Sequence, residues 1–159
     1  MSAAKSPITT LSSASEDDTA RIAAMLARRC MPGDCILLHG DLGAGKTAFA
    51  RGFIQAVAPG CGDIVSPTFT LVQTYPAGSG VLIYHFDLYR LESVREVEEI
   101  GLEEALQSGI TLVEWPELAR HLLPKTALEI TIGMGTSPDA RQLAFAGPAA
   151  IWEERLKER

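Results

Sequence analysis

The stretch Gly40-Asp41-Leu42-Gly43-Ala44-Gly45-Lys46-Thr47 decides how the rest of this sequence is interpreted. It matches the pattern G-x-x-x-x-G-K-[ST], which is typical of loops that bind nucleotide phosphates. The apolar run Ile36-Leu37-Leu38 before the loop predicts a buried strand, and the periodicity of residues 48–57 after it predicts a helix. A glycine-rich loop between strand and helix directs backbone N–H groups and the positive end of the helix dipole at a phosphate. These features predict a nucleotide-binding site.

The residue types within the loop indicate separate roles. Gly43 and Gly45 permit backbone angles and a close approach that a Cβ would prevent. We expect Lys46 to reach the β- and γ-phosphates and to act in catalysis, and the Thr47 hydroxyl to coordinate Mg²⁺. ATP and GTP are not separated by this pattern, although an Asn-Lys-x-Asp sequence that reads guanine is absent. The residues predicted to contact the nucleotide here are Gly40, Asp41, Leu42, Gly43, Ala44, Gly45, Lys46 and Thr47.

Length and composition favour one globular domain spanning residues 1–159, with residues 1–7 as a flexible tail. Hydrophobic residues make up 47% of the chain and charged residues 21%. The net charge of −6 argues against a broad surface that contacts nucleic-acid phosphates. No apolar run approaches the roughly 20 residues that span a bilayer, so no membrane association is expected. Three cysteines without metal-like spacing, and no signal peptide, predict a cytoplasmic protein.

The remaining pattern predicts an α/β fold: a three-layer domain of the phosphate-loop type with a mixed central sheet. Two runs, 71–75 and 81–86, alternate across a turn-rich connector and predict an antiparallel hairpin. Runs 127–132 and 142–145 predict a second antiparallel pair. Ser15, followed by Asp18, predicts the N-cap of a first helix. We also expect an edge strand at 8–11, short helices at 93–99, 102–107 and 116–122, a buried strand at 110–113 and a terminal amphipathic helix at 151–157.

Two later strands end in a carboxylate that can complete a metal site. The run 81–86 leads to Asp87, and the run 110–113 leads to Glu114. Spacing alone does not rank the two as Mg²⁺ ligands, and either can instead be a helix cap or an ion-pair partner. Thr68 follows a Ser-Pro turn where nucleotide switches often place a γ-phosphate sensor, although spacing alone favours an ordinary strand start.

Several other polar and aromatic residues carry two interpretations. His85 is expected to be a packed strand histidine rather than a catalytic base. Arg90 is either a phosphate sensor or an ion-pair partner of Glu92. Trp115 is more simply a core aromatic than a contact with the nucleotide, the hairpin or a partner surface. The acidic run is a solvated helix face or a docking surface for a basic partner, and comprises Glu96, Glu98, Glu99, Glu103 and Glu104.

Four motifs together resemble the TsaE family, the bacterial ATPases of tRNA threonylcarbamoyladenosine (t⁶A) biosynthesis. They are the loop at 40–47, Ser66-Pro67-Thr68-Phe69, His85-Phe86-Asp87-Leu88-Tyr89-Arg90 and Leu112-Val113-Glu114-Trp115-Pro116, in this order and spacing. The resemblance covers about residues 12–132. A phosphate loop occurs in many families, whereas the set of four motifs is specific.

This resemblance implies an ATPase that acts with a threonylcarbamoyl transferase subunit (TsaD) and its paralogous scaffold subunit (TsaB). The partner complex would modify N6 of adenosine 37 of tRNA, and this chain would reset it by binding and hydrolysing ATP. The family pattern implies that Thr47 and Glu114 associate with Mg²⁺ and that Asp87 is required for hydrolysis. It also implies that Ser15 and Glu16 lie by the adenine and that residues 66–70 act as a switch. Transfer RNA would be held by the partners.

Two other functions fit a phosphate loop in a chain of this size. One is a small-molecule kinase, although residues 116–125 hold few cations for an arginine-rich lid. The other is a nucleotide sensor that does not hydrolyse ATP and whose only output is partner binding.

Overall fold

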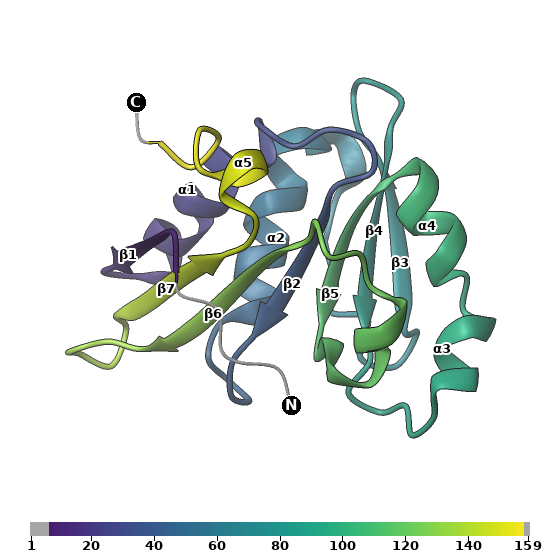
Figure 1. Cartoon of the computed structure of the whole chain (residues 1–159). Helices are drawn as coiled ribbons and strands as arrows, with labels where there is room; N and C mark the ends of the chain where they lie inside the picture. Colours follow the sequence, from purple (N-terminus) through teal and green to yellow (C-terminus); the bar gives the residue numbers. More distant parts are fainter. Residues whose placement is uncertain (1–6, 158–159) are drawn as a thin grey trace.

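One mixed seven-stranded sheet forms the centre of this computed structural model, which describes residues 7–157 (Figure 1). The strand order is β1-β7-β6-β2-β5-β4-β3. The four central strands β6, β2, β5 and β4 run parallel, while β7 and β3 are antiparallel to their inner neighbours. The strands are β1 (Thr9–Ser13), β2 (Cys35–His39), β3 (Val72–Pro76), β4 (Leu82–Asp87), β5 (Ile110–Glu114), β6 (Leu128–Met134) and β7 (Arg141–Ala146). The α/β class and the mixed sheet predicted from the sequence are confirmed.

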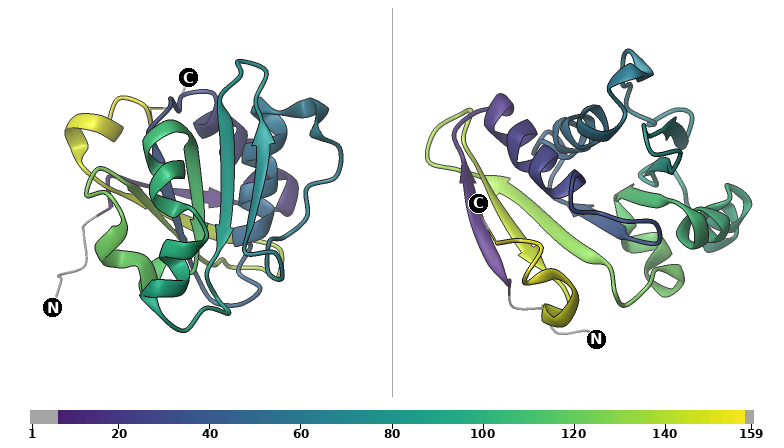
Figure 2. Two further views of the ribbon diagram at one scale, coloured as in Figure 1. Left: turned by 90° about the vertical axis from the view of Figure 1, so that its right-hand side faces the viewer. Right: turned by 90° about the horizontal axis from the view of Figure 1, so that it is seen from above.

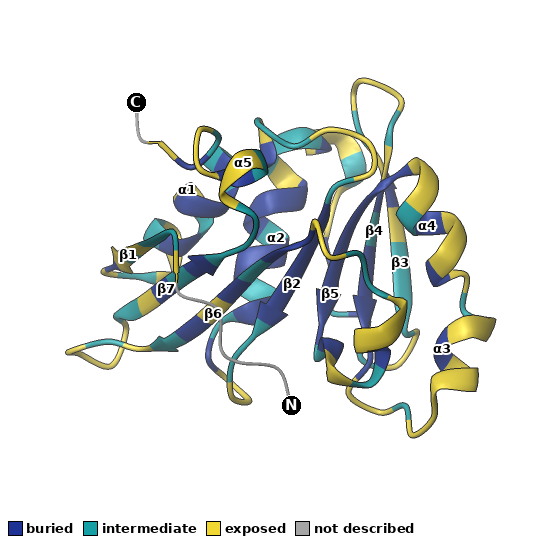
Figure 3. Cartoon of the chain, viewed as in Figure 1, coloured by how far each residue is buried: buried dark blue, intermediate teal, exposed yellow. Residues whose placement is uncertain are grey.

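Burial follows the position of each strand in the sheet (Figure 3). Every residue of β5 is buried, as are the first four residues of β2, because helices cover both faces at the centre. In β6 and β7 buried and more exposed residues alternate, which is the pattern of a sheet covered on one face. Both predicted hairpins form, β3 with β4 and β6 with β7.

Helices lie on both sides of the sheet, as the two views in Figure 2 show. On one side α1 (Glu16–Ala27) and α2 (Lys46–Val57) pack with Ile36, Leu38 and Leu112 in the larger hydrophobic core. On the other side α3 (Val94–Glu99), α4 (Leu102–Ser108) and the 3₁₀ helix η2 (Pro116–Leu122) build a smaller core around Leu37 and Phe86. A short 3₁₀ helix, η1 (Pro59–Cys61), follows α2. This arrangement gives the three layers that the sequence predicted.

The contact between α1 and α2 depends on a glycine. A Cβ placed on Gly52 of α2 would lie 2.6 Å from Cα of Ala20 in α1. Real Cβ atoms essentially never come this close to a backbone atom, so only glycine allows the two helices to approach to this separation. α1 itself begins as predicted, since Ser15 Oγ accepts a hydrogen bond from the N–H of Asp18 at 3.1 Å.

Several boundaries differ from the sequence prediction, and three of the differences have a visible consequence or cause. α2 begins at Lys46 rather than residue 48, so its first turn includes the lysine of the loop. β3 begins at Val72 because Leu71 adopts a left-handed conformation, with φ of 72°. The predicted terminal helix at 151–157 is wrong: α5 covers only Ala149–Trp152. Beyond it the backbone hydrogen bonds are irregular, with the Leu156 N–H donating to the carbonyl of Trp152 at 3.0 Å and the Lys157 N–H to that of Glu154 at 3.3 Å. The Arg29 guanidinium binds the carbonyls of Arg155 and Lys157 there, at 2.6 and 2.7 Å.

Residues 1–6 of the predicted tail lie outside the described residues. Within residues 7–157, none of the helices is both long and apolar enough to cross a bilayer.

Candidate functional site

The loop at 40–47 connects β2 to α2, as its sequence predicted. Gly45 is the N-cap of α2 and has φ of 113°, a left-handed conformation that disfavours residues with a Cβ. Gly40 has no room for a Cβ either, since such an atom would lie 2.7 Å from the carbonyl oxygen of Ile132 in β6. The loop therefore rests directly on the backbone of β6.

Lys46 is folded back onto its own loop. Only 4% of the residue is exposed. Its Nζ donates hydrogen bonds to the carbonyls of Gly40 and Asp41, at 2.5 and 2.9 Å. The same Nζ lies 4.0 Å from the centroid of the Trp115 ring, which is close enough for a cation–π interaction. These contacts hold the ammonium group at the mouth of the loop.

Burial lowers the pKa of Lys46 below the ordinary lysine value, because desolvation disfavours the charged form. The carboxylates of Glu114, Asp87, Asp41 and Glu117, in that order of strength, oppose this shift. A buried ammonium group held by carbonyls is well suited to an anionic ligand. Phosphate oxygens would stabilise the positive charge in place of the water that burial removes.

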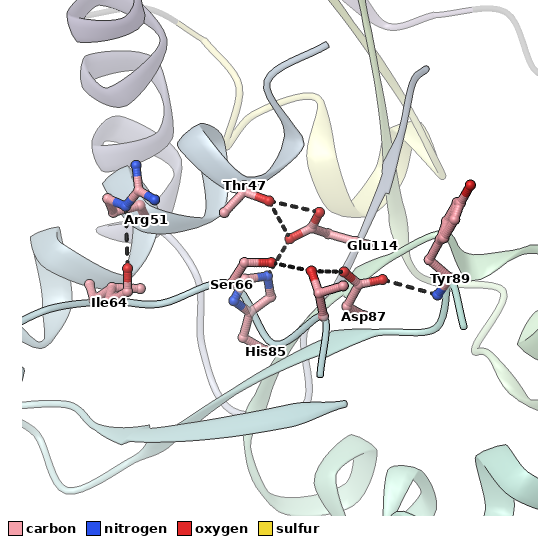
Figure 4. Close-up of polar contacts among 9 residues, drawn as sticks. Thr47, Arg51, Ile64, Ser66, His85, Asp87, Tyr89 and Glu114 are labelled. Atoms are coloured by element: carbon pink, nitrogen blue, oxygen red, sulfur yellow. Dashed lines mark hydrogen bonds and ion pairs between the residues drawn. The ribbon is translucent and has the colours of Figure 1, made fainter. Parts of the chain in front are cut away.

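Thr47 and Glu114 meet at one side of the loop (Figure 4). The Thr47 hydroxyl donates to the carboxylate of Glu114, at 3.1 and 3.2 Å from its two oxygens. Glu114 is 2% exposed, and its Oε2 also lies 2.6 Å from Nε2 of the fully buried His85. Hydroxyl and carboxylate oxygens are the ligand types that Mg²⁺ prefers. The pair can hold a hard divalent cation beside a bound phosphate.

Asp87 lies in the same site and is held by different partners. Its Oδ1 accepts a hydrogen bond from the backbone N–H of Tyr89 at 3.0 Å. Its Oδ2 accepts from the hydroxyl of Thr68 at 3.2 Å, and Thr68 Oγ1 lies 2.7 Å from Oγ of Ser66 (Figure 4). Thr68 belongs to a turn before β3, so the interpretation as an ordinary strand residue is wrong. The Ser66–Thr68 segment is thereby coupled to a carboxylate of the site.

The sheet register explains why these groups converge. Asp87 of β4 is paired with Glu114 of β5, and Leu38 of β2, just before the loop, is paired with Glu114 on the other side. Because the three strands run parallel, their carboxyl ends meet at one edge of the sheet, where ligands of open α/β sheets bind. A hollow of about 230 Å³ lies there, lined by the loop together with Asp87, Glu114 and Trp115.

A second hollow of about 260 Å³ lies on the other side of the loop. It is lined by loop residues, by Glu16 and Thr19 of α1, by Arg51 of α2, and by Asp139 and Arg141 of the β6–β7 hairpin. The Glu16 carboxylate lies 3.7 Å from the Arg51 guanidinium. The structure thus places Glu16 beside the loop, whereas the hydroxyl of Ser15 is used in capping α1. The two hollows together can receive the two ends of a nucleotide.

Trp115 and Arg90 differ from their simplest sequence interpretations. Trp115 is half-buried at the loop and not in the core, and it adopts φ of 55° with its ring edge-on to Tyr89 at 4.7 Å. The Arg90 guanidinium lies over the exposed ring of Phe69, 4.8 Å from its centroid. Within residues 7–157, no ion pair joins Arg90 to Glu92. The acidic residues of α3 and α4 are exposed, as a solvated helix face requires.

Two residues of the site were not assigned a role from the sequence. His85 is a packed strand histidine, as predicted, but its hydrogen bond to Glu114 gives it a place in the site. The only sequence signal was its position two residues before Asp87, on the same face of β4. Arg141, whose Nε donates to the carbonyl of Ala44 at 2.8 Å, gave no local signal, since a contact across 97 residues depends on the fold.

The fold and the loop define a nucleotide-binding protein of the phosphate-loop class. Comparison with known proteins gives the family. The model of a family described as threonylcarbamoyl adenosine biosynthesis protein TsaE matches residues 13–143. The chain therefore belongs to the TsaE family of t⁶A biosynthesis proteins.

Individual relatives agree with this assignment. The chain is 48% identical over 118 residues to the tRNA threonylcarbamoyladenosine biosynthesis protein TsaE of Rickettsia conorii, covering 74% of this chain and 67% of that protein. It is 40% identical over 145 residues to the Bacillus subtilis protein of the same name, covering 89% and 87%. The crystal structure of Bacillus subtilis YdiB superposes with a TM-score of 0.73 at 31% identity, covering 98% of this chain and 94% of that one.

Proposed function

We propose that this protein is a Mg²⁺-dependent ATPase required for t⁶A modification of adenosine 37, and that its ATP binding and hydrolysis reset the threonylcarbamoyl transferase complex between cycles. The observation that carries the proposal is the convergence of Thr47, Glu114 and Asp87 beside the phosphate loop. A loop alone supports binding, whereas two differently held carboxylates next to it support hydrolysis.

Binding would use both hollows. The loop amides and Lys46 would hold the β- and γ-phosphates on the side of Glu114. The base would lie on the other side of the loop, near Glu16 and Arg51, whose side chains line the second hollow. To bind a phosphate, the Lys46 ammonium would exchange its carbonyl partners for phosphate oxygens. ATP, rather than GTP, is proposed because the four-motif resemblance implies an ATPase and the sequence lacks an Asn-Lys-x-Asp pattern that reads guanine.

The metal site passes a simple test of fit. Thr47 and Glu114 offer oxygen ligands only, from a hydroxyl and a carboxylate that already lie 3.1 Å apart. Mg²⁺ favours such ligands and takes the rest of its octahedron from phosphates and water. Bound there, the ion would neutralise charge that develops on the phosphates. Thr47 and Glu114 would hold it, and His85 would keep the Glu114 carboxylate turned towards Thr47.

Asp87 would orient and polarise the attacking water. The N–H of Tyr89 and the hydroxyl of Thr68 fix both of its carboxylate oxygens. Such fixed geometry suits a group that positions a nucleophile. Because Thr68 is part of the proposed switch at 66–70, a change in that segment would change the position of Asp87.

The surface around the site suits a partner that completes it. Leu42, which lines the hollow with the carboxylates, is 75% exposed. Tyr89, whose ring lies edge-on to Trp115, is 51% exposed, and Phe69, next to Thr68, is 83% exposed. Apolar side chains gathered beside a site favour protein contact. We propose TsaD and TsaB as the partners, with tRNA held by them, and residues 1–159 acting as one ATPase domain. Turnover would be slow until the partners close the site.

The test is ATP hydrolysis by the purified protein, alone and with both partners. Phosphate release that increases with the partners and is lost in Asp87→Asn and Glu114→Gln would support the proposal. A phosphorylated metabolite formed from ATP would instead indicate a kinase. ATP-dependent partner binding that continues without any phosphate release would indicate a nucleotide sensor.

A further inference from the structure

The β6–β7 hairpin is hydrogen-bonded to the phosphate loop by the side chain of Arg141. Its Nε donates to the carbonyl of Ala44 at 2.8 Å. Its Nη1 donates to the carbonyls of Pro138 and Ala140, each at 2.8 Å. The Arg141 guanidinium therefore links the phosphate loop to two backbone carbonyls of the hairpin turn.

The turn that carries Arg141 is itself tightly constrained. The N–H of Gly135 donates to the carbonyl of Ala140 at 2.9 Å, and the N–H of Ala140 donates to that of Ser137 at 3.1 Å. A Cβ on Gly135 would lie 2.7 Å from Cβ of Ala140, so the two arms of the turn are in close contact at this point. Because both carbonyls bound by Nη1 belong to this turn, the guanidinium is fixed before any ligand arrives.

The contact with Ala44 sets the direction of one loop amide. A trans peptide is planar, so the C=O of Ala44 and the N–H of Gly45 point in opposite directions. The carbonyl is directed to Arg141, on the hairpin side of the loop, which directs the Gly45 N–H away from the hairpin. Gly45 lines both hollows and immediately precedes Lys46, so its N–H is one of the amides that a phosphate in the loop would meet.

We infer that Arg141 is a positioning residue, which pre-orients the Gly45 N–H for phosphate binding by holding the Ala44 carbonyl. This inference rests on the proposed nucleotide site and adds to it a residue from the opposite end of the chain. Pre-orientation of a donor raises affinity because the cost of ordering the donor has already been met. The gain in affinity should come from binding the phosphates of the ligand, and not from binding its base.

The experiment compares two ligands in three proteins. Calorimetry would give the Kd of ADP and of inorganic pyrophosphate for the wild type, Arg141→Gln and Gln142→Ala. Gln142 is the matched control because it neighbours Arg141 in β7 but contacts Ser12 of β1. We expect Arg141→Gln to weaken the binding of both ligands by the same factor, up to about tenfold, because the loop amide would then have to be ordered on binding. Gln142→Ala should bind both as the wild type does.

Each other outcome has one meaning. Equal binding of both ligands by Arg141→Gln and the wild type would overturn the inference. Weaker binding of ADP together with unchanged binding of pyrophosphate would also overturn it, because Arg141 would then act on the base or ribose. Failure of the wild type to bind either ligand would overturn the nucleotide site itself.

A second measurement does not depend on how well the variant folds. In wild-type protein labelled with ¹⁵N-glycine, the Gly45 amide proton should shift downfield when pyrophosphate binds, as an amide does when it donates to a phosphate. An unchanged Gly45 resonance at saturating pyrophosphate would contradict the proposed orientation.

Discussion

The hydroxyl of Thr47 lies 3.1 and 3.2 Å from the two carboxylate oxygens of Glu114, although the residues are 67 positions apart in the chain. This contact joins the phosphate loop to the end of β5. The two carboxylates of the site therefore have different partners. Glu114 accepts from Thr47, whereas Asp87 accepts hydrogen bonds from the hydroxyl of Thr68 and the backbone N–H of Tyr89. The geometry thus favours Glu114 as the metal ligand and Asp87 as the residue that positions water.

Glu114→Gln should remove the Mg²⁺-dependent part of nucleotide affinity. The amide keeps the shape of the side chain but loses the charge that attracts a cation, so ADP affinity measured with Mg²⁺ should fall at least about tenfold. Affinity measured in EDTA should not change. Glu103→Gln, an exposed carboxylate on α4, is the matched control. Equal Mg²⁺ dependence in Glu114→Gln and the wild type would show that Glu114 is not the ligand.

Asp87→Asn should separate binding from hydrolysis. The amide can retain the contacts with Tyr89 N–H and Thr68 but is a poor acceptor for a water proton. We expect an ATP affinity within about twofold of the wild type and a loss of partner-stimulated hydrolysis of at least about 100-fold, the typical contribution of a positioned acid or base. A titration of ATP binding and a time course of phosphate release test this. Weakened ATP binding with a normal turnover rate would place Asp87 in the binding site only.

Nucleotide affinity should fall as pH rises through the pKa of Lys46. Burial lowers that pKa below 10.5, and the charged form is the one that attracts phosphates. Nucleotide phosphates are already ionised at alkaline pH, so binding above neutrality should be accompanied by proton uptake at Lys46. Calorimetry of ADP binding from roughly pH 7 to 10, in buffers of different ionisation enthalpy, measures this uptake. The uptake should vanish in Lys46→Met; if it persists, another group is responsible.

Gly52→Ala should destabilise the fold by roughly 1–3 kcal/mol, the usual cost of forcing extra volume into a packed contact. The new methyl group would meet the backbone of Ala20, which cannot move without separating α1 from α2. Gly60→Ala is the matched control, since a Cβ there meets nothing within 4 Å. Urea unfolding of the two variants gives the comparison. A stability loss no larger for Gly52→Ala than for Gly60→Ala would mean that the helices adjust freely.

One thiol should react quickly in the folded protein. Burial raises the pKa of Cys35 to about 12 and moves the pKa of Cys30 well above its ordinary value, which removes the reactive thiolate. Cys30 and Cys61 are both half-buried, so the slow reaction expected of Cys30 rests on its raised pKa and not on its exposure. A thiol reagent at neutral pH should titrate one group before denaturation and all three cysteines after it. Rapid reaction of a second thiol would contradict the raised pKa of Cys30 or of Cys35.

The local features of the site could be predicted from the sequence, whereas its long-range contacts could not. The loop, the two hairpins and the strand ends at Asp87 and Glu114 follow from patterns within short windows. The choice between the two carboxylates required the strand order, which places β5 next to β2 and β4 beyond it. The contact of Arg141 with Ala44 required the fold of the C-terminal hairpin over the loop.

The wrong predictions have the same origin. Residues 151–157 carry a helical pattern, yet the helix ends at Trp152, and Arg29, distant in the sequence, binds the carbonyls of Arg155 and Lys157 in the segment that follows. Trp115 belongs by composition to a core, but it follows the last residue of β5 and turns in a left-handed conformation towards Lys46. In both cases a tertiary contact overrides a local preference.

The central claim is that ATP hydrolysis at this site resets a partner complex. The most direct measurement is the number of t⁶A nucleosides formed per complex when this protein is combined with TsaD, TsaB, tRNA, threonylcarbamoyl-AMP and ATP. We predict several turnovers with the wild-type protein and a single turnover with Asp87→Asn or Glu114→Gln. Several turnovers with both variants, or without this protein, would contradict the account.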